Sequence, residues 1–452
     1  MKKLGNLVKP VEPAPTYKGI RDLLVRLSEQ GQSVFASALE SPTIQEINNE
    51  YYYWDKVKYK VPASLKGVLQ PAEFWQIVKY SRILNQKTLS VAGHVFHFTQ
   101  TDGLYSLLHE FDLNLGGTLG GQTTLDKTEQ HKFLIGSLME ESIASSQIEG
   151  AVTSRVVAKD MLRKGRSPRN LSERMILNNY ETINYIVTQK DKFLTAESLM
   201  TIHRLITADT LEHEADSGRL RTHNDIHVVD ALNGEIIHTP PSHPVLPDFV
   251  QALCELFNDE NPPFFLHPVV KASIIHFLIG YFHPFIDGNG RTARALFYWY
   301  LLRKGYWLTE YLSISRVIMQ SRNQYYRAFQ YVENDSNDVT YFVHYQTNAL
   351  KKAYKDLKHY IERKTAERTQ RASLLRLGGL SERQVEILQI IRDEPTLALT
   401  VKEIQNRFGT SNQTARNDVE KLVAARFLSV IKINRKEQRF VKSEQFDNLL
   451  KP

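Results

Sequence analysis

Cysteine is almost absent from this sequence, whose 452 residues include a single one, Cys254. One cysteine cannot form an intramolecular disulfide or a cysteine-based metal site, which fits a reducing compartment. No stretch approaches the roughly 18 uninterrupted apolar residues of a membrane-spanning helix. The start Met1-Lys2-Lys3 is followed by prolines instead of the apolar segment of a signal peptide. We therefore expect a cytoplasmic protein that does not enter a membrane.

The overall composition is ordinary apart from an excess of positive charge. The hydrophobic fraction of 42% and the charged fraction of 24% are typical of a folded globular protein. The length predicts two or three domains. The net charge is +7, and basic residues crowd residues 351–371. This crowding fits either a solvated helix face or attraction to polyanions.

Glycine-rich stretches divide the chain into three regions. Residues 116–121 are rich in glycine and end an N-terminal accessory region, residues 1–125, which carries no interpretable motif. Residues 126–370 show apolar side chains at helical spacing. Leu377-Gly378-Gly379 marks the boundary of a C-terminal unit, residues 376–452. The sequence therefore predicts a mainly α-helical protein with three parts.

One segment of the helical region has the pattern of a β-hairpin. His227-Val228-Val229 and Glu235-Ile236-Ile237-His238 flank Asn233-Gly234, which is the strongest short signal for a hairpin turn. A hairpin inside a helical domain is typical either of a functional flap or of an ordinary surface turn.

A glycine-containing loop, residues 283–291, lies between two expected helices, residues 268–282 and 292–303. Pro284 ends the first helix, and Gly288 and Gly290 let the backbone turn and approach a ligand. The free N–H groups at the start of the second helix form an anion site. Arg291 and Arg294 add two positive charges to it.

The same loop holds the groups needed for attack on a nucleotide phosphorus. Asp287 is its only carboxylate and suits Mg²⁺ with phosphate oxygens as further ligands. His283 is its only side chain that can accept a proton near neutral pH. A base, a metal ligand and an anion cradle together favour phosphorus chemistry.

These residues resemble the Fic family signature, H-P-F-x-D-G-N-G-R-x-x-R, at every fixed position. The resemblance implies a Fic-type helical core and transfer of AMP from ATP, with Mg²⁺, to a Ser, Thr or Tyr hydroxyl of a protein. It implies that His283 is the base and Asp287 the metal ligand. The anion hole would comprise Gly288, Asn289 and Gly290, with Arg291 and Arg294 on the β- and γ-phosphates.

The resemblance also assigns roles outside the loop. The hairpin is similar to the family's flap, which can hold a target segment by strand addition. The target-binding candidates are Ile236, Ile237, His238 and Thr239. Asn323, Tyr325 and Tyr326 lie where relatives line the adenine pocket, although aromatic side chains at such spacing are also typical of a plain core.

A Ser-x-x-x-Glu-Gly pattern precedes the signature in the same region. Ser145 and Glu149 are four residues apart, on one helix face, and Gly150 is placed to end the helix. Fic proteins carry [S/T]-x-x-x-[E/N] as an inhibitory helix, so the resemblance implies that Glu149 pairs with Arg294 and forces ATP into an unproductive pose. Glu149 could instead be a solvated helix-end residue, or position a water that removes AMP.

The C-terminal unit has the pattern of a winged helix. Ser381 opens a first helix, residues 401–408 form a second, and Ser411 opens a third, followed by strand-like runs 427–433 and 438–441. It resembles winged-helix domains appended to bacterial Fic proteins. Candidate DNA contacts are Asn412, Gln413, Arg416 and Arg435. The same fold also serves dimerisation or target docking.

Three alternatives to an autoinhibited AMP-transferase stay open. The chain could remove AMP, or act as a Fic-type kinase, although the kinase branch carries Lys where this chain has Gly290. It could also be an ATP-sensing, DNA-binding transcriptional regulator. The expected partners are a protein substrate, DNA through the winged helix, and a second copy of the chain.

Overall fold

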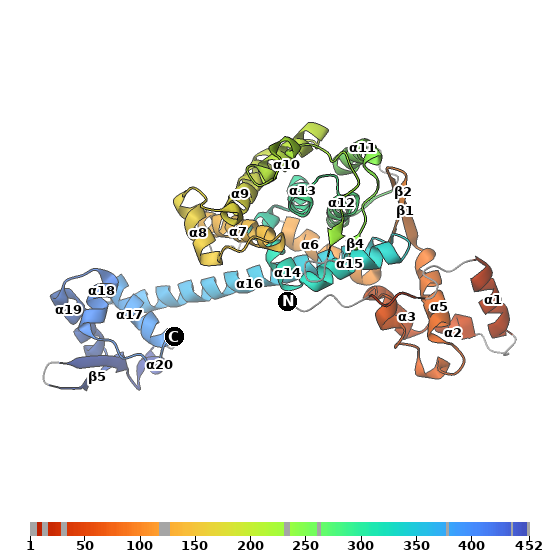
Figure 1. Cartoon of the computed structure of the whole chain (residues 1–452). Coiled ribbons are helices and arrows are strands. Elements are labelled where there is room, and N and C mark those ends of the chain that lie inside the picture. The colour runs from red at the N-terminus through yellow and green to blue at the C-terminus, as the bar shows by residue number, and fades with distance from the viewer. Residues whose placement is uncertain are drawn as a thin grey trace. The chain divides into compact units, whose positions relative to one another are not determined.

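The computed structural model describes residues 7–10, 17–28, 34–116, 127–229, 236–259, 264–376, 379–434 and 437–449. Residues 117–121 of the first expected boundary, Asn233-Gly234 of the hairpin, Leu377-Gly378 and the DNA-contact candidate Arg435 lie outside these ranges. The chain forms two compact units, Met1–Leu357 and Lys358–Pro452. Helix α16, Thr340–Arg376, runs from the first unit into the second (Figure 1).

The N-terminal part of the first unit consists of short helices and one hairpin. Its elements are α1 (Tyr17–Ser28), α2 (Val34–Leu39), α3 (Pro42–Asn49), α4 (Trp54–Val57), η1 (Ala63–Leu65), α5 (Pro71–Ile83), β1 (Gln86–Val91), β2 (His94–Thr99), α6 (Asp102–Phe111) and η2 (Asp112–Gly116). Strands β1 and β2 are antiparallel in register Val91↔His94. The two turn residues, Ala92 and Gly93, have φ of 48° and 78°, as a tight two-residue hairpin turn requires.

Buried charges join this N-terminal part to the rest of the unit. The Lys79 ammonium lies 2.8 Å from the Asp335 carboxylate, and the side chains of both residues are almost fully buried. The Tyr51 hydroxyl donates to Asp338 at 2.6 Å. Because a buried charge is costly unless it is paired, these contacts fix the N-terminal part against the start of α16. The accessory region is therefore one body with the helical region that follows it.

The helical region is built around two adjacent helices, α12 and α13 (Figure 1). Its elements are α7 (Lys127–Ile148), α8 (Arg155–Lys164), α9 (Leu171–Gln189), α10 (Ala196–Thr207), η3 (Glu214–Asp216), β3 (Val228–Val229), β4 (Ile236–His238), η4 (His243–Val245), α11 (Leu246–Asn258), α12 (Pro268–Phe282), α13 (Asn289–Arg303), η5 (Trp307–Tyr311), α14 (Ile314–Gln320), α15 (Arg322–Asn334) and α16. Helices α7, α9 and α10 pack against α13, and α11 packs against α12.

Most residues of α12 and α13 are buried, and α12 is accordingly apolar around most of its circumference, whereas the first turns of α13 bury the polar residues Asn289, Arg291 and Arg294. Helix α12 has 15 residues and is the more apolar of the two. Within the described ranges, no helix combines the length and apolar character needed to cross a membrane.

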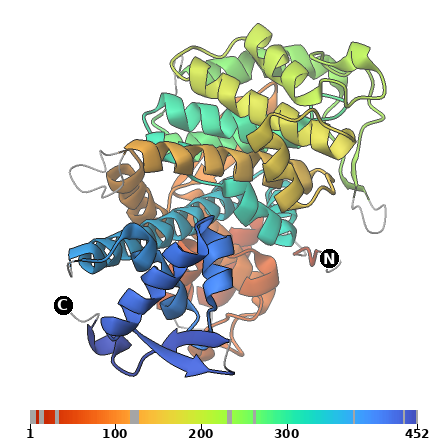
Figure 2. The same cartoon turned by 90° about the vertical axis from the view of Figure 1, so that its left-hand side faces the viewer.

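The C-terminal unit beyond α16 has the predicted winged-helix order. Its elements are α17 (Glu382–Asp393), α18 (Val401–Phe408), α19 (Asn412–Ala424), β5 (Leu428–Lys432), β6 (Gln438–Lys442) and α20 (Phe446–Leu449). Ser381 caps α17, as predicted, and α19 begins at Asn412 with Ser411 as its cap, one residue after the predicted start. The predicted inward residues, among them Leu388 and Val419, form one core. Figure 2 shows the hairpin β5–β6 as dark blue arrows.

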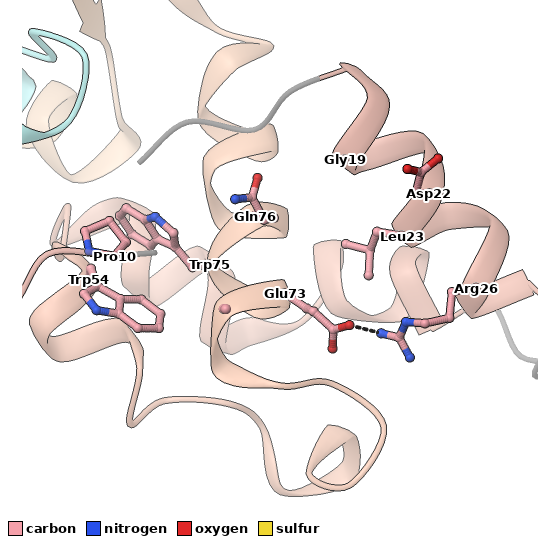
Figure 3. Close-up of a pocket in the computed structure, with 10 residues that line it drawn as sticks. Pro10, Gly19, Asp22, Leu23, Arg26, Trp54, Glu73, Trp75 and Gln76 are labelled. Carbon is pink, nitrogen blue, oxygen red and sulfur yellow. Dashed lines mark hydrogen bonds and ion pairs between the residues drawn. The ribbon is translucent and has the colours of Figure 1, made fainter. Parts of the chain in front are cut away.

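A cavity of about 410 Å³ lies in the N-terminal part, between α1, α4 and α5 (Figure 3). Leu23, Trp54 and Trp75 give it mostly apolar walls, and Arg26 pairs with Glu73 beside it. All its lining residues belong to the first 76 residues of the chain. The cavity is therefore separate from the signature loop.

Candidate active site

The signature loop connects two helix ends through left-handed backbone at both sides. Helix α12 ends at Phe282, and His283 has φ 47° and ψ 59°. Helix α13 begins at Asn289, capped by Gly288 with φ 81°. The expected start at residue 292 was therefore wrong by three residues, because the positive φ of Gly288 turns the chain directly into the helix. The first-turn amides of α13 are the anion donors that a helix start provides.

The His283 imidazole is oriented by the last turn of α12. Its Nδ1 lies 3.2 Å from the Gly280 carbonyl oxygen. A carbonyl only accepts, so Nδ1 carries the proton in this contact and Nε2 keeps its lone pair. Burial lowers the pKa of His283 to about 4, and the nearby charges of His238 and Arg221 act in the same direction. His283 is therefore neutral at pH 7, as a general base must be.

Arg221 holds the loop from the chain segment before the flap. Its Nε donates to the His283 carbonyl at 2.9 Å, and one Nη reaches the carbonyls of Phe282 (3.4 Å) and Pro241. Its backbone N–H donates to the Pro284 carbonyl at 2.9 Å. The side chain is only 3% exposed. Sequence reasoning missed Arg221, since nothing in the pattern of residues connects it with a loop 62 positions away.

A second histidine, His203 on α10, contacts the loop at the Phe285 ring and at the Asp287 carbonyl. Its Nδ1 accepts from the Gly218 N–H at 2.9 Å, so Nε2 donates to the Asp287 carbonyl at 2.8 Å. The ring stacks on Phe285 with centroids 3.8 Å apart. Burial lowers the pKa of His203 to about 4, so the ring is neutral and serves as a fixed spacer. This residue was also missed from sequence.

The Asn289 side chain closes the loop onto itself. Its amide nitrogen donates to the Phe285 carbonyl at 2.8 Å, and its amide oxygen accepts from the Phe285 N–H at 3.0 Å. The residue is 2% exposed. Any contribution of Asn289 to an anion hole therefore comes from its backbone N–H, because the side chain is committed to the loop.

Asp287 is exposed and held from one side by Arg291. Its carboxylate accepts from the Gly288 N–H at 2.6 Å and pairs with Arg291 at 3.1 Å. Arg291 is 1% exposed and also donates to the Ile206 carbonyl at 3.1 Å. The Arg291 side chain thus turns inward toward α10 in this structure, and its contact with phosphates stays a prediction.

Glu149 and Ser145 surround Arg294. The Arg294 guanidinium donates to the Ser145 hydroxyl at 2.8 Å, to the Ser145 carbonyl at 3.0 Å and to Glu149 at 2.9 Å. Helix α7 ends at Ile148, and Gly150 has φ 100°. These contacts bring the end of α7 against the second turn of α13.

The Glu149 carboxylate also lies against Gly290. A Cβ atom at Gly290 would be only 2.2 Å from the nearer carboxylate oxygen. The carboxylate thus occupies the start of α13, where a helix favours negative charge. Arg294 Nη1 is buried and has no hydrogen-bond partner among the described residues. The start of α13 therefore has space for one anionic group beside Gly290, which we call the Gly290 seat, and a buried donor, Arg294 Nη1, next to it.

The flap strands β3 and β4 are present, and their side chains differ in exposure. Val228 pairs with His238 and Val229 with Ile236. Val229 and Ile236 are 51% and 58% exposed, whereas His238 is only 9% exposed. The His238 ring is turned inward onto the Tyr281 carbonyl, and the contact of His238 with a target stays a prediction. Thr239 is exposed, with its hydroxyl 3.4 Å from His227, and the side chain of Ile237 lies outside the described residues.

The expected adenine-pocket residues divide between core and surface. Tyr325 is buried, its hydroxyl lies 2.9 Å from His276 Nε2, and its ring packs on Phe329. Tyr325 therefore packs in the core in this structure, and its contact with adenine stays a prediction. Asn323 and Tyr326 are half-buried on the same helix, where nucleotide contact stays a prediction.

The DNA-contact candidates lie on the third helix of the C-terminal unit. Asn412, Gln413 and Arg416 are exposed on α19. Gln413 donates to Asn417 at 2.9 Å, and Asn412 donates to Gln405 of α18 at 3.3 Å. The helix therefore presents amide and guanidinium groups on the face opposite its apolar core.

Comparison with known families identifies two domains. Residues 193–301 match the Fic/DOC family, a range that covers α10 to α13 with the signature loop. Residues 383–431 match the DeoR-like helix-turn-helix domain, from α17 to β5. The chain thus carries a Fic domain followed by a DeoR-like helix-turn-helix domain.

Comparison with individual proteins gives partial matches to adenylyltransferases. The protein adenylyltransferase Fic of Nematostella vectensis is 31% identical over 173 residues, 36% of this chain and 37% of that protein. The protein of the same name from Culex quinquefasciatus is 27% identical over 224 residues, 49% of this chain and 41% of that protein. This chain therefore spans about two fifths of these relatives' length.

A solved structure shares the fold. A Fic family protein from Desulfovibrio desulfuricans G20 superposes with a TM-score of 0.50 and 19% identity, over 76% of this chain and 97% of that one. The similarity confirms the predicted Fic-type helical fold.

Proposed function

We propose that this chain is a protein adenylyltransferase that moves AMP from ATP onto a Ser, Thr or Tyr hydroxyl of a protein target. The observation that carries the proposal is a neutral, oriented imidazole, His283, next to the anion-binding start of α13. The Fic domain and the relatives named as adenylyltransferases support the same chemistry. The single cysteine supports a cytoplasmic location.

His283 acts as the general base in this reaction. Its Nε2 takes the proton of the target hydroxyl while the hydroxyl oxygen bonds to the α-phosphorus of ATP. The bond from that phosphorus to the bridging oxygen breaks, and pyrophosphate leaves. The loop amides and Arg294 stabilise the negative charge that accumulates on the phosphate oxygens.

The residues at the start of α13 fit a triphosphate. Gly290 has no side chain, and a carboxylate oxygen already comes within 2.2 Å of where a Cβ would lie, so an anionic group fits there. Arg294 Nη1 is a buried donor without a partner among the described residues. We infer that phosphate oxygens use both, in the place that Glu149 takes in the free protein.

Asp287 fits a magnesium ion that is shared with the substrate. Its carboxylate is 56% exposed and directed by the Gly288 N–H and Arg291. No group of three or more candidate ligand side chains exists among the described residues. Mg²⁺ held by Asp287 would therefore complete its shell with phosphate and water oxygens, and it would neutralise phosphate charge.

We further propose that Glu149 inhibits the enzyme and that the flap receives the target. Glu149 uses Arg294 and the Gly290 seat, both of which the triphosphate needs. The exposed apolar side chains of Val229 and Ile236 support a flap that pairs with an extended target segment.

A second candidate function is DNA binding by the C-terminal unit. The DeoR-like helix-turn-helix match and the exposed polar face of α19 support it. In that case the chain is a DNA-binding regulator whose Fic domain responds to ATP.

Transfer from labelled ATP distinguishes these functions. The full chain with Mg²⁺ and a cell lysate is incubated with α-³²P-ATP or with γ-³²P-ATP, and labelled proteins are counted. Label only from the α-position supports adenylyl transfer, and His283→Ala should abolish it while His213→Ala, which changes an exposed histidine, should not. Label from the γ-position would mean a kinase. Absence of label in both, with Glu149→Gly included, would refute the transferase and favour the regulator or removal of AMP.

A further inference from the structure

His238 connects the base of the flap to α12, the helix that ends just before the catalytic histidine, and to α15. Its Nε2 lies 2.7 Å from the Tyr281 carbonyl oxygen, in the last turn of α12. Its Nδ1 lies 3.0 Å from the Glu333 carboxylate, at the end of α15. The His238 side chain is 9% exposed and the Glu333 side chain 19% exposed. The contact is therefore a largely buried ion pair between segments 95 residues apart.

Both partners of the ring are acceptors, which determines its protonation. A carbonyl oxygen and a carboxylate can only accept, so both ring nitrogens must carry protons, and His238 is an imidazolium. Burial alone lowers the pKa of His238, but the Glu333 carboxylate and the Tyr281 carbonyl outweigh it and raise the pKa overall. The ring therefore keeps its charge to a higher pH than an ordinary histidine and loses it as the pH rises further.

The positive ring is placed to act on the end of α12. The last carbonyls of a helix lack intrahelical partners and favour cations. Here the Tyr281 carbonyl is bound by His238, while Arg221 binds the carbonyls of Phe282 and His283. Because Tyr281 precedes His283 by two residues, the position of the base depends on these two cations.

We propose that His238 and Glu333 form a latch that fixes the base of the flap to the catalytic end of α12 and so positions His283. The role of the latch in catalysis rests on the proposed transferase function, whereas the ion pair between His238 and Glu333 does not. Neither residue is a catalytic residue, because each acts through the loop. In the latched state the flap strand β4 is held beside the loop, so that a target bound along it presents its hydroxyl to His283.

Other charged and titratable groups lie near His238 and could affect its charge. Tyr281 packs its ring 5.2 Å from that of His238, and its hydroxyl lies 3.2 Å from His94 on β2. The charge of His238 lowers the pKa of His283, and Arg221 reaches Pro241 just beyond the flap. The pKa values of Tyr281 and His94 are shifted away from neutrality, upward and downward respectively, both by burial. Glu333 therefore supplies the charge that keeps the His238 ring protonated.

The first test measures the latch without any enzymatic assay. The full chain is labelled with ¹⁵N-histidine, and the ring nitrogens of His238 are assigned by their loss in His238→Gln. Both nitrogens should be protonated at pH 7. In Glu333→Gln, which keeps an acceptor but removes the charge, the midpoint of the His238 titration should fall by one pH unit or more. A neutral ring at pH 7, or a midpoint that Glu333→Gln leaves unchanged, would overturn the latch.

The second test measures the pH profile of AMP transfer from α-³²P-ATP in the Glu149→Gly background. Transfer should decline on the alkaline side as His238 loses its proton, and Glu333→Gln should move that decline to lower pH. Glu212→Gln, an exposed carboxylate, serves as the control. A residue that only stabilised the fold would reduce transfer equally at every pH, and this outcome would refute the positioning role. Absence of transfer at all pH values, with the titration as expected, would refute the transferase and leave the latch standing.

Discussion

The ion pair between Glu149 and Arg294 allows a quantitative prediction for Glu149→Gly. The Glu149 side chain is 28% exposed and that of Arg294 is 3% exposed, so the pair is mostly desolvated. A hydrogen bond to a charged group contributes about 1.5–3 kcal/mol. If ATP must displace this contact, removing it should increase productive ATP binding by about 10- to 150-fold. The rate of AMP transfer at ATP concentrations below saturation should rise by the same factor.

The same substitution should destabilise the protein when no nucleotide is present. Arg294 would keep its two contacts with Ser145 but lose its counter-charge, at a cost of about 1–3 kcal/mol. ATP with Mg²⁺ should then stabilise the variant more than the wild type, by about 1.4 kcal/mol for each tenfold gain in affinity. Transfer from α-³²P-ATP and thermal unfolding with and without ATP measure the two effects.

Glu140→Gln is the matched control for this prediction. Glu140 lies on the same helix α7, and its carboxylate pairs with Arg155 and Lys159 instead of Arg294. It should leave transfer unchanged. If Glu149→Gly does not raise transfer, or if Glu140→Gln raises it equally, the carboxylate at the start of α13 is not the inhibitory group.

Two further substitutions test the seat at Gly290 and the helix α19. Gly290→Ala places a methyl group 2.2 Å from the Glu149 carboxylate and 3.2 Å from Arg294 Nη1, so it should destabilise the wild type more than the Glu149→Gly background, where only the Arg294 contact remains. Equal costs in urea unfolding of both backgrounds would contradict the placement of Glu149. Arg416→Ala on α19 should weaken binding to a random-sequence DNA duplex and reduce the slope of log K against log salt by about 1, while Lys402→Ala on α18 should not; equal slopes in both variants would exclude α19 as the DNA-facing helix.

Elements with a local cause could be predicted from sequence. The apolar run of α12, the serine cap of α17 and the start of α19 near Ser411 depend on neighbours within a few residues, and the structure confirms them. The start of α13 was missed because Gly288 was assigned to a loop. A glycine before a helix can either extend a loop or cap the helix, and only the φ of 81° distinguishes the two.

The supports of the site could not be predicted, because their partners are distant in sequence. Arg221 and His203 contact the loop from 62 and 84 residues away, and no periodicity encodes such pairs. His238 was assigned to the target because it ends a flap strand. The partner of its side chain in the structure, Glu333, belongs to a different helix, α15, and the contact between the two is a property of the tertiary fold.

The N-terminal region gave no motif for the same reason. Lys79 is a residue type that is almost always exposed, so sequence reasoning treats it as surface. In the structure it is buried against Asp335 and Asp338, two carboxylates near the start of α16. The sequence does not show which charged residues pair in the interior. It therefore could not predict that the N-terminal region packs against the helical region.

The charges around the loop follow from the two helix ends that it joins. Cations, His238 and Arg221, bind the carbonyl end of α12, and an anion, Glu149, lies at the amide end of α13. If the triphosphate replaces Glu149, inhibitor and substrate use the same donors. A substitution of Arg294 would then weaken both together and could not separate them. A substitution of Glu149 removes only the inhibitory group and leaves Arg294 in place. Inhibition can therefore be weakened without weakening substrate binding only by substitutions at the end of α7, and not by substitutions in α13.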